Sequence, residues 1–311
     1  MSSIAGYFDT TTSTLNPNNV GPPHSFFVYG TVPVFLGFVV LAVLARRREG
    51  RLIGRHLQLY GSTGWLAEGE VVMLASLLLL ALGTSVFFAA RNMPGYATLM
   101  NSQVGQTIVV RARDGTQIVA MGPSYGEWLH ADEIPQVMKD AMVAVEDRRY
   151  YTHFGIDPIG LVRALYVALR DDSPVRATST ISQQLARNVF LNSNRTIDRK
   201  LREAVLAMAL EWKFSKEQIL ELYLNKIYLG NRAYGVGAAA QVYYGRPVNE
   251  LTLAEIAMIA GLPKAPSAYN PLVNPDRALA RRSYVLRRMQ QLGFISDAEY
   301  AMAATAPFEA A

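Results

Sequence analysis

The stretch EDRRYYTHFG, from Glu146 to Gly155, decides how the rest of the chain is interpreted. It follows apolar residues spaced at i, i+3, i+4, i+7, i+8 and i+11 from Ile134 to Val145, which predict a helix whose end is fixed by packing. A carboxylate at such an edge is partly desolvated, so its pKa rises and it becomes a usable general base. Glu146 is therefore the candidate base, although an acidic pair at a helix end is more often solvated.

The rest of this stretch suits a loop that supports the carboxylate. We expect Asp147 and His153 to lie at the substrate site and to hold the loop there. A lone histidine more often braces a structure than reacts. Gly155 indicates a backbone position with positive φ. Glu146 is the only residue of this stretch to which we assign a chemical role.

Composition points to a membrane protein with an anionic partner. Half of the 311 residues are apolar and the mean hydropathy is positive, which predicts membrane spans. The absence of cysteine excludes disulfides and thiolate metal sites, and four histidines without HExxH argue against catalytic zinc. We therefore expect no dedicated metal site. The net charge of +5 suits a phosphate-bearing substrate or an anionic membrane surface. No nucleic-acid-binding motif is present.

Two apolar runs predict two transmembrane helices within residues 25–92. They cover residues 25–45 and 71–90, and the alternative for the first is a buried core helix. An arginine-rich loop lies between them, whereas the polar tail of residues 1–24 contains no Lys or Arg. By the positive-inside rule the loop is cytoplasmic. The domain after the second span then lies on the other side of the membrane.

The remaining chain predicts a mainly α domain with a small β element at its entrance. Residues 93–132 form a connector, in which β-branched runs around Asp114-Gly115 predict a hairpin. Residues 133–311 predict a succession of short helices with no competing strand pattern after residue 130. Four pairs have capping-box spacing: Thr180 with Gln183, Ser215 with Gln218, Thr252 with Glu255, and Ser296 with Glu299.

Two further clusters carry candidate chemistry. ATSTISQQLARN, Ala177–Asn188, gathers hydroxyls and amides at a helix start, where phosphate groups bind well. Its alternative is an ordinary capped helix. RKLRE, Arg199–Glu203, could form a positive clamp for a diphosphate oriented by its glutamate, or a surface salt-bridge helix. Each signal is weak alone.

Taken together, in this order and spacing, the clusters resemble the glycosyltransferase family 51 domain. The resemblance covers roughly residues 107–305. Tyr150 stands in the phenylalanine place of the first motif, and three further positions depart from the family pattern, with Ala177 for glycine, Ser182 for threonine and Arg187 for lysine. The five motifs are EDxxFxxHxG at Glu146, Asp147, His153 and Gly155; GxSTxTQQ at Ser179, Thr180, Gln183 and Gln184, with Asn188 beyond; RKxxE at Arg199, Lys200 and Glu203; ILELYLNKIYLG from Ile219 to Gly230; and RRxxVL at Arg281, Arg282, Val285 and Leu286.

The resemblance implies a lysozyme-like helical fold and an inverting enzyme that polymerises lipid II into β-1,4 glycan strands, the reaction that moenomycin inhibits. Glu146 would take the proton of the acceptor 4-hydroxyl. Glu203 would orient the diphosphate clamp. The implied substrate-binding residues are Asp147, His153, Thr180, Gln183, Gln184, Arg187, Arg199 and Lys200.

The resemblance also implies surroundings for the domain. An enzyme of this family requires no cofactor by its sequence, and a divalent cation, Mg or Mn, could bind at the diphosphate. The implied partners are lipid II, the growing glycan strand, membrane lipids, a transpeptidase, and division or elongation proteins. The implied location is the bacterial inner membrane. There the chain would be a multi-pass protein with its catalytic domain on the periplasmic or extracellular side. No SxxK, SxN and KTG set is present, so we expect no penicillin-binding transpeptidase domain in these residues.

Two other functions remain open at this point. A lytic transglycosylase or muramidase also has a helical domain with one key glutamate, but it needs no diphosphate clamp. An inactive membrane scaffold of the cell-wall machinery needs neither Glu146 nor the clamp. The presence of both features favours the polymerase.

Overall fold

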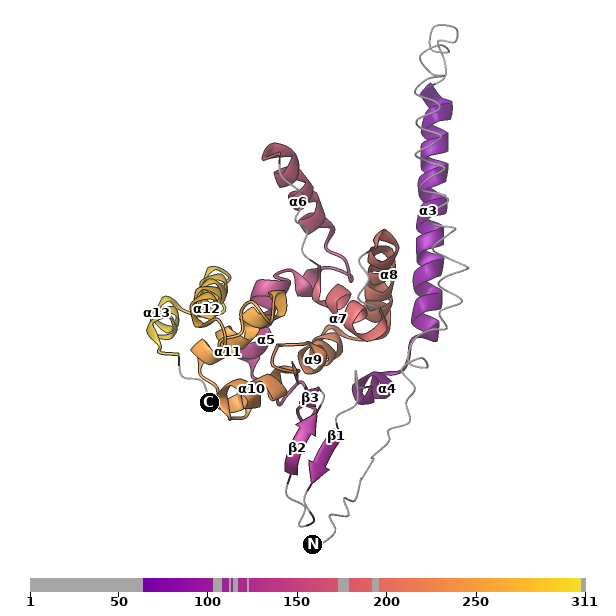
Figure 1. Ribbon diagram of the computed structural model, residues 1–311. Coiled ribbons are helices and arrows are strands. Elements are labelled where there is room, and N and C mark those ends of the chain that lie inside the picture. Colours follow the sequence, from indigo (N-terminus) through magenta and orange to yellow (C-terminus); the bar gives the residue numbers. More distant parts are fainter. Residues whose placement is uncertain are drawn as a thin grey trace.

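The computed structural model describes residues 64–102, 108–111, 113, 117–121, 123–172, 179–191 and 196–308, and this part of the chain is mainly α-helical, as predicted (Figure 1). The polar tail, the first predicted span and the arginine-rich loop lie outside the described residues. The α-helices are α3 (Gly64–Asn92), α4 (Tyr96–Asn101), α5 (Gln136–Glu146), α6 (Pro158–Arg170), α7 (Ile181–Phe190), α8 (Ile197–Lys213), α9 (Lys216–Lys226), α10 (Val236–Tyr244), α11 (Leu253–Gly261), α12 (Pro275–Gln291) and α13 (Asp297–Thr305). Short 3-10 turns lie at η3 (Tyr150–Thr152), η4 (Val248–Glu250) and η5 (Leu262–Lys264).

Helix α3 contains the second predicted span. Among the described helices it alone is long and apolar enough to cross a bilayer, over Met73–Asn92. Leu79 and Leu80 are exposed, whereas Ala89 and Ala90 near its end are buried against the domain. The helix packs on α8 and extends away from the helical body (Figure 1).

A buried carboxylate fastens the chain after α3 to the domain. Glu221 on α9 accepts hydrogen bonds from the Tyr96 hydroxyl at 2.5 Å, from Trp128 Nε1 at 2.7 Å and from the backbone NH of Ala131 at 2.9 Å. These donors come from α4 and from the connector. Because one carboxylate accepts all three hydrogen bonds, the chain that follows α3 is held in a fixed place on the domain.

The small β element consists of two pairs of strands. β1 (Ile108–Arg111) and β2 (Gln117–Met121) are antiparallel, which confirms the predicted hairpin, while its turn residues lie outside the described part. β3 (Ser124–Tyr125) pairs in parallel with β4 (Ala233–Tyr234). The expectation of no strand after residue 130 is wrong at β4. Gly230 and Gly235, at φ +85° and +86°, bend the chain so that this pair can form. The sequence around β4 has no alternation of apolar residues from which a strand could be predicted.

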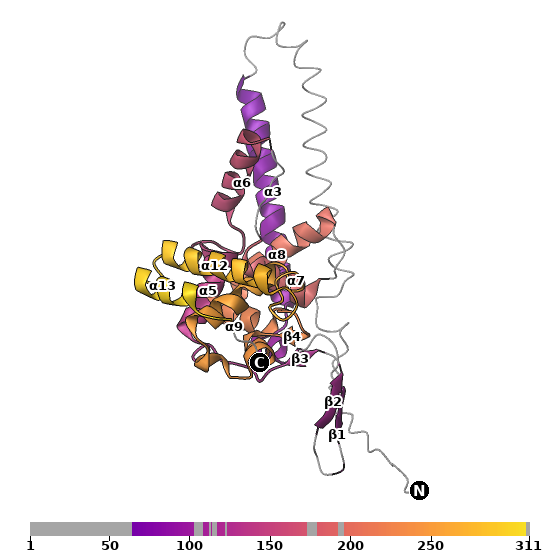
Figure 2. The ribbon, with the colours of Figure 1, turned by 60° about the vertical axis from the view of Figure 1, so that its left-hand side comes forward.

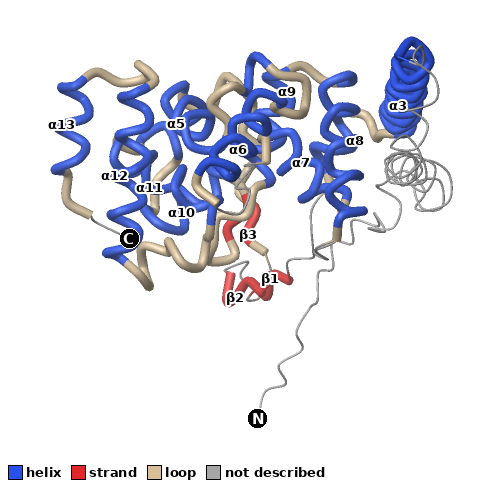
Figure 3. Tube along the Cα trace, turned by 90° about the horizontal axis from the view of Figure 1, so that it is seen from above, coloured by secondary structure: helices blue, strands red, loops and turns tan. Residues whose placement is uncertain are grey.

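The helices form one row from α13 through α12, α5 and α7 to α8 and α3 when seen from above (Figure 3). Helix α5 packs on α11 and α12, and α7 packs on α8 and α9. Tyr150, Tyr223 and Tyr243 are fully buried in the core. All four predicted capping boxes are confirmed, at the first turns of α7, α9, α11 and α13.

Helix α6 stands away from the body. It begins at Pro158, as predicted, and projects from the same end of the molecule as α3 (Figures 1 and 2). Its apolar side chains are unusually exposed, with Ile159 at 66%, Val162 at 67% and Leu169 at 77%. A helix that faces water normally carries polar side chains on its exposed sides, so the exposed apolar surface of α6 is unusual.

Candidate active site

Glu146 is the last residue of α5, and its side chain is 11% exposed. One carboxylate oxygen accepts a hydrogen bond of 2.8 Å from Gln184 Nε2, and the other lies 3.7 Å from Arg281 Nη2. Burial raises the pKa of Glu146, and this effect exceeds the lowering by the Gln184 hydrogen bond and by the charges of Arg281, Lys264 and Arg187. The result is a carboxylate with increased basicity, fixed by an amide and a guanidinium.

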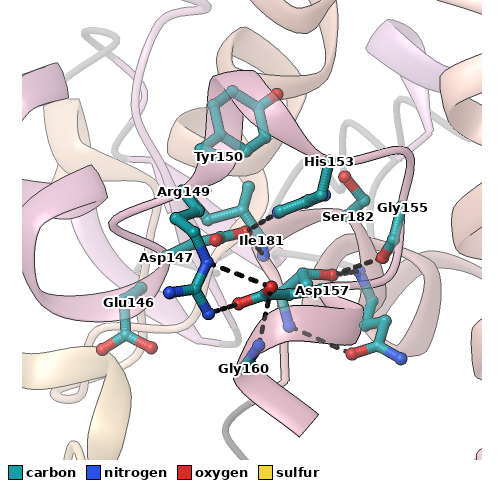
Figure 4. A network of polar contacts seen from close by, with 12 residues as sticks. Glu146, Asp147, Arg149, Tyr150, His153, Gly155, Asp157, Gly160, Ile181 and Ser182 are labelled. Atoms are coloured by element: carbon teal, nitrogen blue, oxygen red, sulfur yellow. Dashed lines mark hydrogen bonds and ion pairs between the residues drawn. The ribbon is translucent and has the colours of Figure 1, made fainter. Parts of the chain in front are cut away.

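Asp147 and His153 form a brace behind this carboxylate (Figure 4). Asp147 Oδ2 accepts a hydrogen bond from the backbone NH of Ile181 at 3.0 Å and lies 2.8 Å from His153 Nε2. Their side chains are only 4% and 3% exposed. The pair thus joins the loop after α5 to the first residue of α7, while the Glu146 carboxylate points away from the network (Figure 4).

Gly155 brings the same loop against α8. Its φ is +78°, and a Cβ at this position would lie 2.7 Å from the backbone of Ala207 and Met208. Its carbonyl accepts a hydrogen bond of 2.6 Å from the Thr180 hydroxyl. Thr180 also caps α7 reciprocally with Gln183, and both residues are buried. The structure therefore gives Thr180 and Gln183 internal contacts that position α7, and their predicted contact with substrate stays a prediction.

Gln184 connects the candidate base to the core. Its Nε2 donates to Glu146, and its Oε1 accepts a hydrogen bond of 3.2 Å from the hydroxyl of Tyr223. Tyr223 is fully buried on α9, and burial raises its pKa, so the hydroxyl stays protonated as a donor. Because this donor fixes the oxygen of the amide, the NH₂ group must face Glu146.

The predicted clamp lies on the first turn of α8. Lys200 Nζ is 2.5 Å from Glu203 Oε1 and donates to Ser179 Oγ at 2.7 Å, while Arg199 Nη1 lies 3.5 Å from Glu203 Oε2. Glu203 is fully buried, whereas the Lys200 side chain is half-exposed. The glutamate therefore orients the two cations from inside. Arg187, in the last turn of α7, is close enough to act electrostatically on Glu146.

Glu146 also lines a cleft of about 590 Å³. The cleft lies between the loop after α5, helix α6 and helix α12. Its wall is strongly basic, with Arg148, Arg149, Arg163 and Arg288. Ser179, the hydrogen-bond partner of Lys200, lines the same cleft, so the base, the clamp and the cleft adjoin.

Three functional contacts were not predicted from sequence. Arg281 was noted only as part of a motif, yet it is buried, pairs with Glu146 and lies over the rings of Tyr269 and Tyr284, with 5.7 and 4.8 Å to the centroids. Lys264 adds positive charge near Glu146, and Tyr223 orients Gln184. The only sequence signals were the fourth motif, which contains Tyr223, and the fifth motif, which contains Arg281. Neither motif indicates which side chain contacts Glu146.

Comparisons with known proteins show which family this chain resembles. The model of the family described as "Transglycosylase" matches residues 114–290. Penicillin-binding protein 1A of Vibrio cholerae is 45% identical over 241 residues, covering 76% of this chain and 29% of that protein. Penicillin-binding protein 1A of Escherichia coli is 49% identical over 209 residues, covering 67% and 25%. The crystal structure of penicillin-binding protein 1A from Haemophilus influenzae aligns at 30% identity over 68% of this chain and 22% of that one, with a TM-score of 0.41. The chain thus spans between a quarter and a third of the length of these curated relatives.

Proposed function

The chain belongs to the transglycosylase family, and on this premise we propose that it is a peptidoglycan glycosyltransferase that polymerises lipid II with release of undecaprenyl diphosphate. One observation carries the proposal beyond family membership. Glu146 is a buried carboxylate of raised pKa, held by Gln184 and Arg281 at the edge of a basic cleft. A base beside a concentration of positive charge suits transfer from a diphosphate leaving group.

In the proposed reaction, Glu146 removes the proton of the acceptor GlcNAc 4-hydroxyl. The oxygen forms a bond to the MurNAc anomeric carbon of the growing chain as the bond from that carbon to the diphosphate breaks. The diphosphate leaves with the electron pair, and configuration inverts in this single displacement. General-base catalysis of this kind contributes about 10²–10⁴-fold.

The clamp residues stabilise the leaving group in this proposal. Arg187, Arg199 and Lys200 supply charge-assisted hydrogen bonds to the diphosphate oxygens. Glu203 holds Arg199 and Lys200 in place, as its contacts with both support. A divalent cation at the diphosphate would add to this charge, although no group of three or more His, Cys, Asp or Glu side chains lies together in the part of the chain that the structure describes. Thr180, Gln183 and Gln184 complete the substrate site.

We further propose a lysozyme-like helical fold over residues 133–311, entered through the connector of residues 93–132, with membrane-spanning segments in residues 25–92 and a polar tail before them. The exposed apolar surface of α3 supports a membrane location, and α6 projects from the same end of the molecule. A lipid-linked substrate requires an active site near the membrane surface. The proposed place is the inner membrane as a multi-pass protein, with the domain on the periplasmic or extracellular side, alongside a transpeptidase and division or elongation proteins.

Polymerisation of lipid II by the full chain in detergent tests this function. We expect glycan strands from the wild type and a loss of at least a hundredfold in rate for Glu146→Gln, in line with the about 10²–10⁴-fold value of a base. Glu250→Gln is the matched control, because this exposed glutamate lies in η4, outside the cleft. Release of soluble fragments from preformed glycan, without polymerisation, would instead show a lytic enzyme. No reaction with either substrate would favour a scaffold.

A further inference from the structure

A buried network of polar side chains lies behind the base and outside its cleft. Its centre is Glu211 on α8, which is only 3% exposed. Oε1 of this carboxylate accepts a hydrogen bond of 2.5 Å from the hydroxyl of Ser182 on α7 and one of 2.7 Å from Nζ of Lys216, the first residue of α9. One oxygen thus joins three helices. None of the three side chains lines the cleft beside Glu146.

Tyr150 connects this network to the loop after α5. Its side chain is fully buried, and its hydroxyl donates a hydrogen bond of 2.6 Å to the backbone carbonyl of Lys216. The ammonium group of the same lysine lies 4.4 Å from the centroid of the Tyr150 ring, within the range of a cation–π contact. Burial raises the pKa of Tyr150, so its hydroxyl stays protonated as a donor. The phenylalanine of the family pattern would keep the ring contact but would lack this hydrogen bond.

The loop that Tyr150 fixes carries the brace of the base. The ring of Tyr150 lies edge-on to that of His153, with 6.3 Å between the centroids, and His153 contacts Asp147. The backbone NH of Tyr150 donates to the carbonyl of Asp147 at 2.9 Å. Asp147 in turn accepts a hydrogen bond from the first residue of α7, which directly precedes Ser182. The network therefore supports the brace from behind, while the Glu146 carboxylate points away from it (Figure 4).

The same contacts fix the amide that holds Glu146. Ser182 is close to Gln184 on α7, and the amide of Gln184 donates to the Glu146 carboxylate at 2.8 Å. Helix α9, which begins at Lys216, carries Tyr223, whose hydroxyl fixes the oxygen of that amide at 3.2 Å. A displacement of α7 relative to α9 would weaken one of these two hydrogen bonds. Buried polar networks oppose such displacements, because a satisfied network rigidifies the elements that it joins.

We propose that Tyr150 and Ser182 are positioning residues for Glu146. Through Lys216 and Glu211 they fix the loop after α5 and helix α7 to α8 and α9, which keeps the amide partner of Glu146 in place. The inference rests on the proposed function of Glu146 as the base. It assigns a role to two positions at which this chain departs from the family pattern, and it places neither side chain in contact with substrate.

The test is steady-state polymerisation of lipid II by the full chain in detergent, measured across pH for Tyr150→Phe, Ser182→Ala and the double variant. Each single change should lower kcat roughly threefold to tenfold, less than the about 10²-fold that a misplacement of about 1 Å costs. KM should change less than about twofold, because neither side chain lines the cleft. The acid limb of the kcat profile should move to higher pH, since a displaced Gln184 lowers the pKa of Glu146 less. The double variant should lose little more than the more affected single variant, because both changes open one network.

Control variants separate positioning from a general loss of stability. Ser182→Thr restores a hydroxyl that can donate to Glu211, so it should recover the kcat and the pH profile lost in Ser182→Ala. Tyr300→Phe on α13 removes a tyrosine hydroxyl outside the network and the cleft and should change neither. The three cations that act on the pKa of Glu146 are intact in every variant: Arg281, Lys264 and Arg187.

Three outcomes would count against the inference. A folded Tyr150→Phe protein whose melting temperature falls while kcat and the acid limb stay unchanged would overturn it, because the network would then serve stability alone. A rise in KM with unchanged kcat would also overturn it and would indicate that the loop contacts substrate. Additive losses in the double variant would show two independent contacts in place of one network. In all three cases wild-type polymerisation upholds the proposed function, whereas a wild type that does not polymerise lipid II would remove that function and the inference with it.

Discussion

Replacing Gln184 by methionine should move the pH dependence of turnover. The side chain keeps its length but loses the NH₂ group that donates to Glu146 at 2.8 Å. That hydrogen bond lowers the pKa of Glu146, so its loss lets burial raise the pKa further. A hydrogen bond to a charged group is worth about 1.5–3 kcal/mol. Loss of this hydrogen bond should therefore raise the pKa of Glu146 further.

The sign of the effect on activity follows from the role of a base. As the proposed base, Glu146 acts deprotonated, so a higher pKa leaves less of the active form at a given pH. The acid limb of the rate profile should move to higher pH, and on that limb turnover should fall roughly tenfold to a hundredfold, the equivalent of about 1.5–3 kcal/mol. At a pH well above the new pKa, turnover should recover. The assay is the initial rate of lipid II polymerisation measured across pH, with the exposed Gln241→Met as matched control.

An unmoved acid limb in a folded Gln184→Met protein would refute this reasoning, because the titrating group would not be Glu146. A parallel loss at every pH would indicate that Gln184 binds substrate and does not tune the base. Tyr223→Phe is a graded version of the experiment. It removes the hydroxyl that fixes the amide oxygen at 3.2 Å but keeps the amide, so a smaller shift in the same direction is expected.

Three further predictions concern stability and the clamp. Glu146→Gln should raise the melting temperature while abolishing turnover. Folding raises the pKa of Glu146, so the free energy of unfolding that this carboxyl contributes is present below its unfolded pKa and is lost as pH rises through its folded pKa. A gain in melting temperature that does not grow from acidic to neutral pH in thermal scans would contradict this prediction. Gly155→Ala should lower the free energy of unfolding by about 2 kcal/mol or more in urea titrations, from the left-handed φ and the contact of its Cβ with the backbone of α8; a neutral result would show that the loop can move. Glu203→Gln should reduce polymerisation less than Glu146→Gln and lower the free energy of unfolding by only about 1 kcal/mol, because Lys200 is half-exposed and water can solvate it once its partner is neutral. Equal loss of activity in both variants would mean that the two glutamates act as one unit.

Local sequence determined a large part of the helical framework. The apolar stripe before Glu146 predicted α5 and placed the carboxylate at its end, although the helix begins at Gln136 because Pro135 stands at its cap. The four capping boxes marked helix starts correctly, since a hydroxyl and an acidic or amide side chain three residues later satisfy each other within one turn. The apolar length of α3 and the glycine-centred hairpin are equally local signals.

Tertiary structure alone decided which side chains meet. Arg281 reaches Glu146, Tyr223 orients Gln184, and Asp147 accepts from the first NH of α7, all across long stretches of sequence. Periodicity states which face of a helix is buried but not which partner faces it. The stretch from Glu146 to Gly155 thus indicated which residue we propose as the base. The charge around that carboxylate was set by tertiary packing, because Arg281 on α12, Lys264 in η5 and Arg187 on α7 come from separate elements.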